Sequence, residues 1–126
     1  MKRVLIVLLA LGLLCIGILL YNGKDVTIML FNESKQESVF IEVFWDEKKV
    51  FSDSVSQMKL FYGSKINTSF GKHNLKVIAN EVVENETISV FLTKYVFIDY
   101  NGESPHNKEF GVPVFLITER IYFNYD

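Results

Sequence analysis

Hydrophobic and polar residues alternate along most of this chain. In DVTIMLFN, the apolar residues Val26, Ile28 and Leu30 fall on every second position. In SVFIEVFW, every second residue from Val39 to Trp45 is apolar in the same way. A period of two places successive side chains on opposite faces of a β-strand. The pattern therefore predicts a β-rich body in which each strand buries one face.

The same pattern predicts individual elements. A hairpin is expected over residues 39–55, with its turn at Glu47–Lys49. Gly63 and Ser64 predict a break between two short extended pieces. Residues 87–98 keep one phase of alternation and predict a single long strand, bulged near Thr93 and Lys94. A polar loop begins at Asn101, and Pro113 is expected at the start or on the edge of a last strand.

About seven or eight short strands then fit into residues 24–126, and no helical period of 3.6 occurs there. This predicts an all-β fold, an antiparallel β-sandwich of the immunoglobulin-like or transthyretin-like kind. The chain has a single cysteine, so the Cys…Trp…Cys pattern of antibody domains is absent. That absence argues against a true antibody-type domain.

The N-terminal segment has a different pattern. Lys2 and Arg3 precede an uncharged apolar run from Val4 to Leu20. The run exceeds the roughly 7–15 apolar residues of a secretory signal and reaches the lower range for a membrane span, about 17–25. We expect residues 1–23 to form one hydrophobic helix, a signal anchor that contacts the bilayer through residues 4–21. The side chains expected to anchor it are Val4, Leu5, Ile6, Leu13, Leu14, Ile16 and Leu20.

Two other outcomes stay open for this N-terminal segment, which we call the leader: cleavage, and lipidation at Cys15. Ala10 and Gly12 have the spacing of a cleavage site, but cleavage there would leave an apolar tail. A lipidated cysteine usually follows a small residue, whereas Cys15 follows Leu14. Retention is therefore favoured over cleavage and over lipidation. Basic residues ahead of the run favour a cytoplasmic N-terminus. We expect a single-pass protein of the cell membrane, with residues 24–126 as a domain outside the cytoplasm.

The balance of basic and acidic residues limits the classes of partner that we expect. The chain carries 13 basic and 15 acidic residues, and Lys2 and Arg3 belong to the leader, so the remainder is mildly acidic. Nucleic acid requires clustered basic residues, so it is not an expected partner. Beyond the leader there is no cysteine, hence no disulfide and no thiolate metal site. The 11 phenylalanines and 6 tyrosines supply packing instead.

One stretch resembles a known group of proteins. IEVFWDEKKVFSDSV is followed by FGKHNLKVIAN, so that a short hairpin precedes a strand with Gly-x-His and alternating apolar residues. Over Ile41 to Asn80 this order resembles small exported bacterial β-sandwich proteins of unknown function. The resemblance implies a fold and assigns no site.

Candidate chemistry is sparse. His73 and His106 are the two histidines, and they lack the spacing of a metal site. The acidic group Glu81, Glu84 and Glu86 lacks a calcium-loop pattern. No nucleophile elbow and no phosphate-binding loop occurs. We interpret His73 as packed on a sheet edge and bonded to a backbone carbonyl, and His106 as solvated. The sequence predicts no enzyme activity, no metal and no cofactor.

The leading hypothesis is a protein-interaction or assembly module that binds another envelope protein. Sheet edges and aromatic faces are the expected contact surfaces. The residues suggested for such a surface are Phe44, Trp45, Phe91 and Tyr95. The alternative is a module that binds a small molecule or a glycan, with Trp45 or Tyr62 as the platform.

Overall fold

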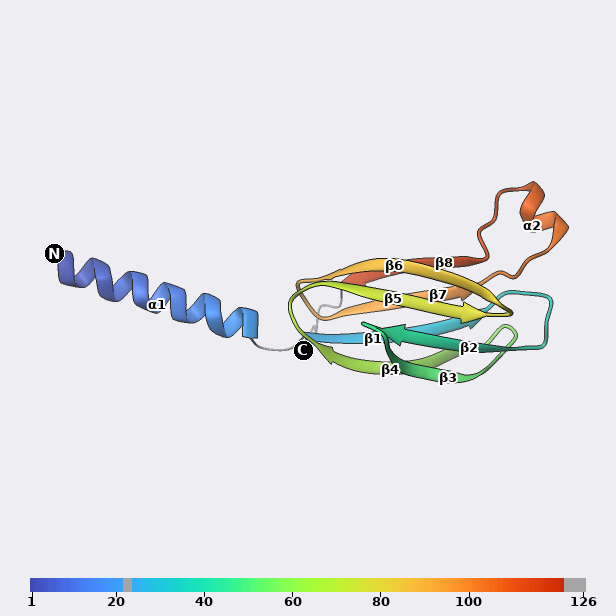
Figure 1. The fold of residues 1–126 in the computed structure, drawn as a ribbon, viewed down its shortest axis with the longest axis horizontal. Helices are drawn as coiled ribbons and strands as arrows, with labels where there is room; N and C mark the ends of the chain where they lie inside the picture. The colour runs from blue at the N-terminus through green and yellow to red at the C-terminus, as the bar shows by residue number, and fades with distance from the viewer. Residues whose placement is uncertain (22–23, 122–126) are drawn as a thin grey trace.

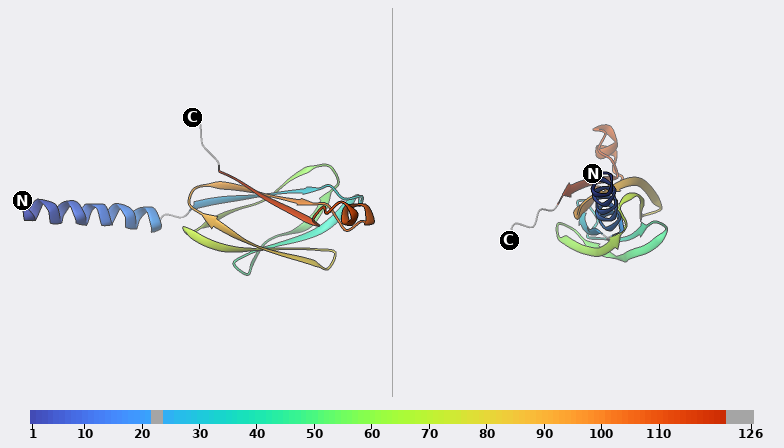
Figure 2. Two further views of the ribbon diagram at one scale, coloured as in Figure 1. Left: turned by 90° about the horizontal axis from the view of Figure 1, so that it is seen from above. Right: turned by 90° about the vertical axis from the view of Figure 1, so that its left-hand side faces the viewer.

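The computed structural model describes residues 1–21 and 24–121, including the α1 side chains as far as residue 18. Two four-stranded sheets pack face to face, and helix α1 (Lys2–Tyr21) precedes them in the chain (Figure 1; Figure 2). A short helix, α2 (Pro105–Glu109), lies between the last two strands. The strands are β1 (Lys24–Asn32), β2 (Ser38–Trp45), β3 (Lys48–Ser56), β4 (Leu60–Thr68), β5 (Gly71–Ala79), β6 (Val82–Val90), β7 (Lys94–Tyr100) and β8 (Phe115–Ile121).

The predicted β-sandwich is confirmed. One sheet has the order β4-β1-β7-β8 and the other β3-β2-β5-β6. The expectation of a fully antiparallel arrangement is wrong at one place, because β1 and β7 pair in parallel. Both strands run away from the end of the sandwich at which β1 begins, and the chain passes through the other sheet between them. Two strands that run the same way can only pair in parallel.

The alternating pattern describes the core correctly. Val26, Ile28 and Leu30 of β1 are fully buried, and so are Ile41 and Val43 of β2. The remaining buried apolar side chains come from both sheets: Val39, Trp45, Phe51, Val55, Leu75, Val77, Ala79, Ile88, Val90, Val96, Ile98, Tyr100 and Phe115. The inner faces of the two sheets therefore form one continuous core.

Tight turns close two hairpins. Asp46 and Glu47 connect β2 to β3, and both have positive φ, 48° and 69°. Asn80 and Glu81 connect β5 to β6 with nearly the same values, 48° and 67°. Two successive residues at positive φ match the right-handed twist of the flanking strands. The predicted hairpin over residues 39–55 is confirmed, although its turn comes slightly earlier than expected.

Two expectations about strand continuity are wrong. Residues 87–98 do not form one strand, because β6 ends at Val90 and β7 begins at Lys94 in the other sheet. Conversely, Gly63 does not interrupt a strand. It lies inside β4 as the extra residue of a bulge, where the pairing register shifts between Ile28 and Met29. A Cβ on Gly63 would lie 2.8 Å from Leu30 Cδ1, so the close approach of β1 favours glycine there.

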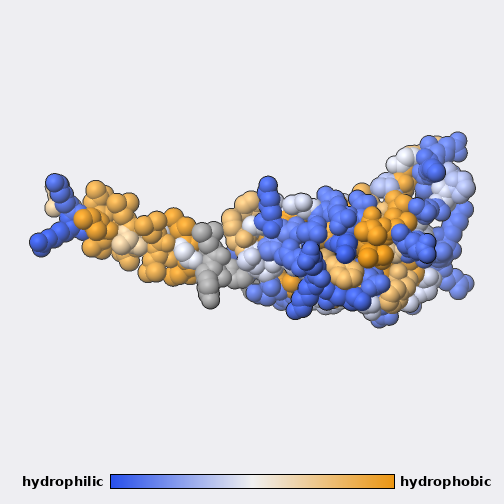
Figure 3. Space-filling model, in the orientation of Figure 1, coloured by the Kyte–Doolittle hydropathy of each residue, from blue (hydrophilic) through white to orange (hydrophobic). Residues whose placement is uncertain are grey.

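Helix α1 exposes its apolar side chains. The large apolar side chains from Val4 to Ile18 are each at least half exposed. Figure 3 shows this contrast with the visible face of the sandwich, which is largely hydrophilic. Six of the seven predicted anchoring residues lie on this exposed helix, and the side chain of Leu20 lies outside the described set. Within the described residues, no helix reaches the length and hydropathy needed to cross a bilayer.

Candidate functional site

Several loops meet at the end of the sandwich opposite the start of β1. Strands β1, β5 and β7 all end there, and α2 lies at this end (Figure 1). The loop 33–37, the turn 80–81 and the loop 101–114 belong to this end, which we call the distal end. Loops held by a rigid sheet scaffold are a common place for binding sites.

Asn32 organises the first of these loops. Its side chain is fully buried, and Nδ2 donates to the carbonyl oxygens of Gln36 and Val55, each at 3.1 Å. Its Oδ1 accepts from the Ser34 N–H at 3.0 Å and from the Ser34 hydroxyl at 2.6 Å. All four hydrogen-bonding positions of the amide are therefore used. This one side chain fixes the shape of the loop and ties it to β3.

A second set of bonds joins this loop to both sheets. Asn80 Nδ2 donates to Gln36 Oε1 and to the Tyr100 hydroxyl, each at 2.8 Å. The Glu33 N–H donates to the Tyr100 carbonyl at 2.8 Å. The first loop, the β5–β6 turn and the end of β7 thus hold one another in place.

The loop before β8 is also internally bonded. Ser104 caps α2, because its hydroxyl accepts from the Asn107 N–H at 3.0 Å. Asn107 Nδ2 donates back to the carbonyl of Asn101 at 2.9 Å. Gly102 has a φ of 78°, and a Cβ there would lie 3.0 Å from Ser34 Cβ. Glycine at this position lets the loop pack closely against the first loop.

These loops enclose a pocket of about 420 Å³, which we call the distal pocket. Most of its lining residues are polar or charged, although apolar atoms supply more of the lining surface than polar atoms do: Glu33, Ser34, Lys35, Gln36, Asn80, Tyr100, Asn101, Gly102, Glu103, Ser104, His106 and Asn107. Nearby, burial raises the pKa of the Asp99 carboxyl, and the negative charge of Glu33 raises it further. Two carboxylates, Glu33 and Glu103, and one lysine, Lys35, therefore line a pocket held by a network of bonded loops.

A second feature lies on the outer face of the sheet β4-β1-β7-β8. Tyr62, Met29 and Phe97 are neighbours across three strands, and Leu60 and Phe31 are neighbours in the adjacent row. Leu116 of β8 lies in that row, beyond Asp99 of β7. We call these six side chains the apolar face: Met29, Phe31, Leu60, Tyr62, Phe97 and Leu116.

The apolar face is accessible. Leu60, Tyr62 and Leu116 are 59%, 57% and 45% exposed, and the other three are half-buried. The guanidinium of Arg120 lies over the Phe97 ring, 5.6 Å from its centre. An exposed apolar group of this kind commonly marks a contact surface.

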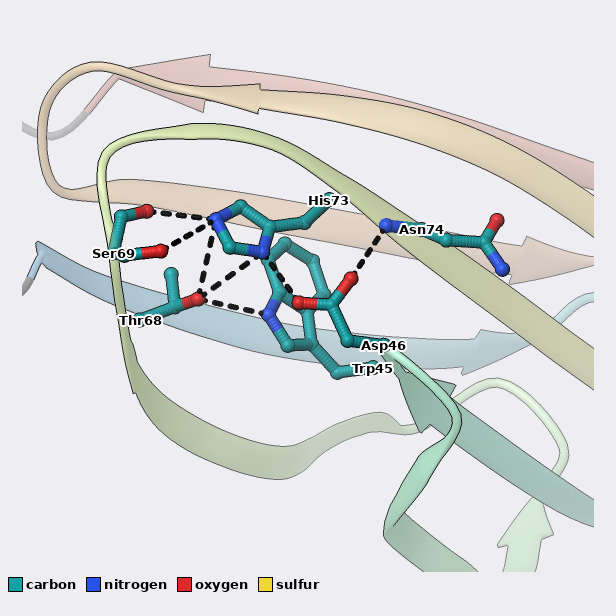
Figure 4. Close-up of polar contacts among 6 residues, drawn as sticks. All are labelled: Trp45, Asp46, Thr68, Ser69, His73 and Asn74. Carbon is teal, nitrogen blue, oxygen red and sulfur yellow. Dashed lines mark hydrogen bonds and ion pairs between the residues drawn. The ribbon is translucent and has the colours of Figure 1, made fainter.

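The third feature surrounds His73, at the end opposite the distal pocket (Figure 4). Its Nδ1 lies 2.5 Å from Asp46 Oδ2, and its Nε2 lies 2.7 Å from the Ser69 carbonyl oxygen. Its ring stacks on Trp45 with 5.2 Å between centres. The predicted bond from His73 to a backbone carbonyl is therefore found.

This histidine group is not arranged for nucleophilic catalysis. The Ser69 hydroxyl lies 3.4 Å from Nε2, farther than the carbonyl of the same residue. The two ring nitrogens face Asp46 Oδ2 and the Ser69 carbonyl oxygen. A backbone carbonyl, and not a serine hydroxyl, therefore holds the closest position at Nε2. The arrangement favours a structural role for His73.

Asp46 belongs to this structural group. Burial raises the pKa of the Asp46 carboxyl, but hydrogen bonds from His73 and from the Asn74 N–H lower it, as does the charge of His73. The net pKa lies below its usual value of 3.8. The Asn74 N–H donates to Asp46 Oδ1 at 2.9 Å, so the carboxylate ties the β2–β3 turn to β5.

The structure does not bring the four suggested surface residues together. Trp45 is buried in the core, so it cannot serve as an exposed platform. Phe44 lies on the outer face of the other sheet, between Lys49 and Lys76. Phe91 is 60% exposed and contacts Phe70 edge-on. Tyr95 lies on the same outer face as Phe97, 6.1 Å away between ring centres.

Sequence reasoning missed the distal pocket and most of the apolar face. Of the residues on the face, the sequence pattern suggested Tyr62 and Phe97 as exposed aromatic residues, and of the residues at the pocket it singled out His106, which was interpreted as solvated. The signal available in the sequence was the row of asparagines at strand ends, Asn32, Asn80 and Asn101. Among the described residues, no three potential metal ligands cluster together.

No family model, no curated protein and no solved structure matches this chain. The resemblance of residues 41–80 to exported β-sandwich proteins therefore stays a prediction.

Proposed function

We propose that this protein is a membrane-anchored module outside the cytoplasm that binds another envelope protein through the apolar face. The observation that carries the proposal is the group of six apolar side chains in two adjacent rows of one outer sheet face, three of them exposed and three half-buried. A sandwich buries the inner faces of its sheets and leaves the outer faces to water. Burial of the Leu60 side chain and of the Tyr62 ring against a partner would remove apolar surface from water, which is favourable.

The composition of the face fits a protein contact. Protein interfaces are enriched in aromatic residues, methionine and arginine. The face contains Tyr62, Phe97 and Met29, and Arg120 lies over Phe97. Lys65 and Arg120 lie in the next row towards α1, and Asp99 lies within the second row of the face, between Phe31 and Leu116.

This charge distribution favours a different protein over a second copy. Two copies anchored in one membrane would pack face to face with their strands parallel. Lys65 and Arg120 would then lie opposite the same residues of the other copy, and like charges across an interface disfavour it. The partner we propose carries apolar side chains opposite Phe97 and acidic side chains opposite Arg120.

The anchor is part of the same proposal. Its support is the uncharged run after Lys2 and Arg3, together with apolar side chains that α1 exposes from Val4 to Ile18. A helix that is apolar on all sides needs an apolar environment. The basic residues before the run favour an N-terminus in the cytoplasm and a sandwich on the outer side.

Of the two sandwich types expected, we propose the transthyretin-like one. Immunoglobulin sandwiches place the first and second strands side by side in one sheet. Here β1 and β2 lie in different sheets, and each sheet has four strands. The strand order supports the alternative to the immunoglobulin type.

Site-specific photocross-linking in intact cells tests the proposed contact. A photoreactive phenylalanine analogue replaces Tyr62 in one variant and Leu116 in another. A third variant carries it at Phe40, which is 52% exposed on the outer face of the other sheet. We expect the same partner protein to be linked from Tyr62 and from Leu116, and not from Phe40.

A second substitution makes the test specific. Leu116→Asp places a charge in the apolar face and should abolish the cross-link from position 62, whereas Phe40→Asp should leave it intact. A cross-link only between copies of this chain would overturn the choice of partner. Absence of any adduct from both positions in folded, membrane-recovered protein would overturn the proposed contact itself.

A further inference from the structure

We infer that the distal pocket is a binding site for a neutral saccharide, separate from the apolar face. Four amide side chains line it, and three of them, Asn80, Asn101 and Asn107, donate from their nitrogens to groups inside the protein. Asn80 donates to Gln36 and Tyr100, and Asn107 donates to backbone carbonyls. Asn101 donates to the carbonyl of Pro113 at 3.0 Å.

The amide oxygens of the same three residues are left for a ligand. Within the described part of the chain, the Oδ1 atoms of Asn80, Asn101 and Asn107 accept no hydrogen bond. The amides cannot rotate to exchange nitrogen for oxygen without losing their internal bonds. These residues line the pocket, so we assign their unused amide oxygens as acceptors for a ligand that carries several hydroxyl donors.

The charged groups at the pocket distinguish a neutral ligand from an anionic one. Glu33 and Glu103 are exposed and form no ion pair with any described residue. Carboxylates accept strong hydrogen bonds from hydroxyl groups, and a pair of them repels an anion. Lys35 and His106 add donors. A sugar hydroxyl both donates and accepts, so it suits this mixture better than a phosphate or a carboxylate does.

The size and the rigidity of the distal pocket also fit a small saccharide. A volume of about 420 Å³ lies within the usual range for small-ligand pockets, roughly 300–1,000 Å³. The bonds made by Asn32 and Asn80 hold the loops before any ligand arrives. A preformed site loses little conformational entropy on binding.

Saturation-transfer-difference NMR on the full chain in lipid nanodiscs, free of glycoside detergent, tests this inference. The probes are maltotriose, cellotriose and chitotriose, with trigalacturonate as an anionic trisaccharide of similar size. We expect at least one neutral probe to bind and trigalacturonate not to bind. Failure of all three neutral probes at 10 mM, or equal binding of trigalacturonate, overturns the inference.

Matched variants locate the binding. Glu33→Gln and Glu103→Gln each remove one charge from the pocket without changing the size of the side chain. We expect each substitution to lower the affinity for the sugar on the order of fivefold. Glu47→Gln, in the turn at the opposite end, should leave the affinity unchanged. Unchanged affinity in the Glu33→Gln/Glu103→Gln double variant would overturn the assignment to this pocket. Leu116→Asp, on the apolar face, should leave sugar binding unchanged, which keeps this test independent of the proposed partner.

Discussion

The indole N–H of Trp45 donates to the Thr68 hydroxyl at 3.0 Å, and this bond joins the two sheets. Trp45 ends β2 in one sheet, and Thr68 ends β4 in the other. Both residues are buried, and a buried indole N–H needs an acceptor. The His73 ring packs on the same indole. At the end of the sandwich where β1 begins, the Trp45–Thr68 bond joins the two sheets beside the contact between Thr68 Oγ1 and the His73 ring.

Thr68→Val should destabilise the protein by about 1–2 kcal/mol, because it leaves the indole N–H of Trp45 buried without an acceptor. Trp45→Phe should lower the free energy of unfolding by more than Thr68→Val does, because it also leaves a cavity. In a double-mutant cycle, with unfolding followed by far-UV circular dichroism, the two losses in the free energy of unfolding should be less than additive by about 0.5–1.5 kcal/mol. Additive costs would mean that the bond does not stabilise the fold.

The Asp46 carboxylate should make the protein sensitive to acid. Its pKa is lower in the folded chain than its usual value of 3.8, so the folded state binds this proton less readily than the unfolded state does. The stabilisation is complete above the unfolded pKa and is lost as the pH falls from about 4 towards the folded pKa.

Thermal unfolding between pH 6 and pH 2.5 measures this effect. Asp46→Asn should lower the midpoint at pH 6 and should differ little from the natural protein at pH 2.5. The exposed carboxylate of Asp53 gives a matched control, and Asp53→Asn should not reproduce the pattern. A constant difference between Asp46→Asn and the natural protein at all pH values would contradict the prediction.

The Asp99 carboxylate should lower the stability of the protein at neutral pH, the opposite of the effect expected for Asp46. Burial and the charge of Glu33 raise its pKa in the folded chain, so ionisation at neutral pH costs stability. Asp99→Asn should raise the unfolding midpoint at pH 7, and the gain should vanish as the pH falls below about 4, where both states are protonated. Glu33→Gln should give a smaller gain, because burial is the larger cause. A lower midpoint for Asp99→Asn at pH 7 would show that the carboxylate makes a stabilising contact.

The sequence predicted the faces of the strands well and their ends poorly. Alternation alone identified the inward side chains of β1, β2 and β5, because a strand with one wet face must alternate. It failed at residues 91–93, where the chain crosses between sheets. Val90 and Val96 are both buried and both even-numbered, so the crossover leaves the phase unchanged and the pattern carries no sign of it.

The candidate sites were harder to predict because they depend on which strands are neighbours. Tyr62, Met29 and Phe97 come from three separate segments, and only the strand order brings them side by side. The distal pocket likewise needs three loops at one end. Short-range patterns do not encode the order of strands in a sheet, so neither feature could be read from local sequence.

The bulge at Gly63 gives a prediction that local sequence also missed. In most strands Gly→Ala is favourable, because alanine restricts the unfolded chain. Here the new Cβ would lie 2.8 Å from Leu30 Cδ1 and 3.0 Å from the Ile28 carbonyl oxygen. Gly63→Ala should therefore destabilise the protein by about 1–3 kcal/mol in urea unfolding. Because Leu30→Val is itself destabilising in the core, the cost of Gly63→Ala should be compared between the natural and the Leu30→Val backgrounds. A smaller cost in the Leu30→Val background is expected, and an equal cost would assign the strain to the Ile28 oxygen.

The proposed anchor gives the last prediction. Protein recovered from carbonate-washed membranes should have an intact mass near 14.6 kDa, the mass of the full chain. Leu13→Arg, in the middle of the apolar run, should reduce membrane recovery, because a central arginine costs about 2.5–3.5 kcal/mol on insertion. Cys15→Ser should change recovery little. A product shortened by the leader in the soluble fraction would point to a free domain, whereas a mass increased by acyl chains and lost in Cys15→Ser would point to a lipid anchor instead of a helix.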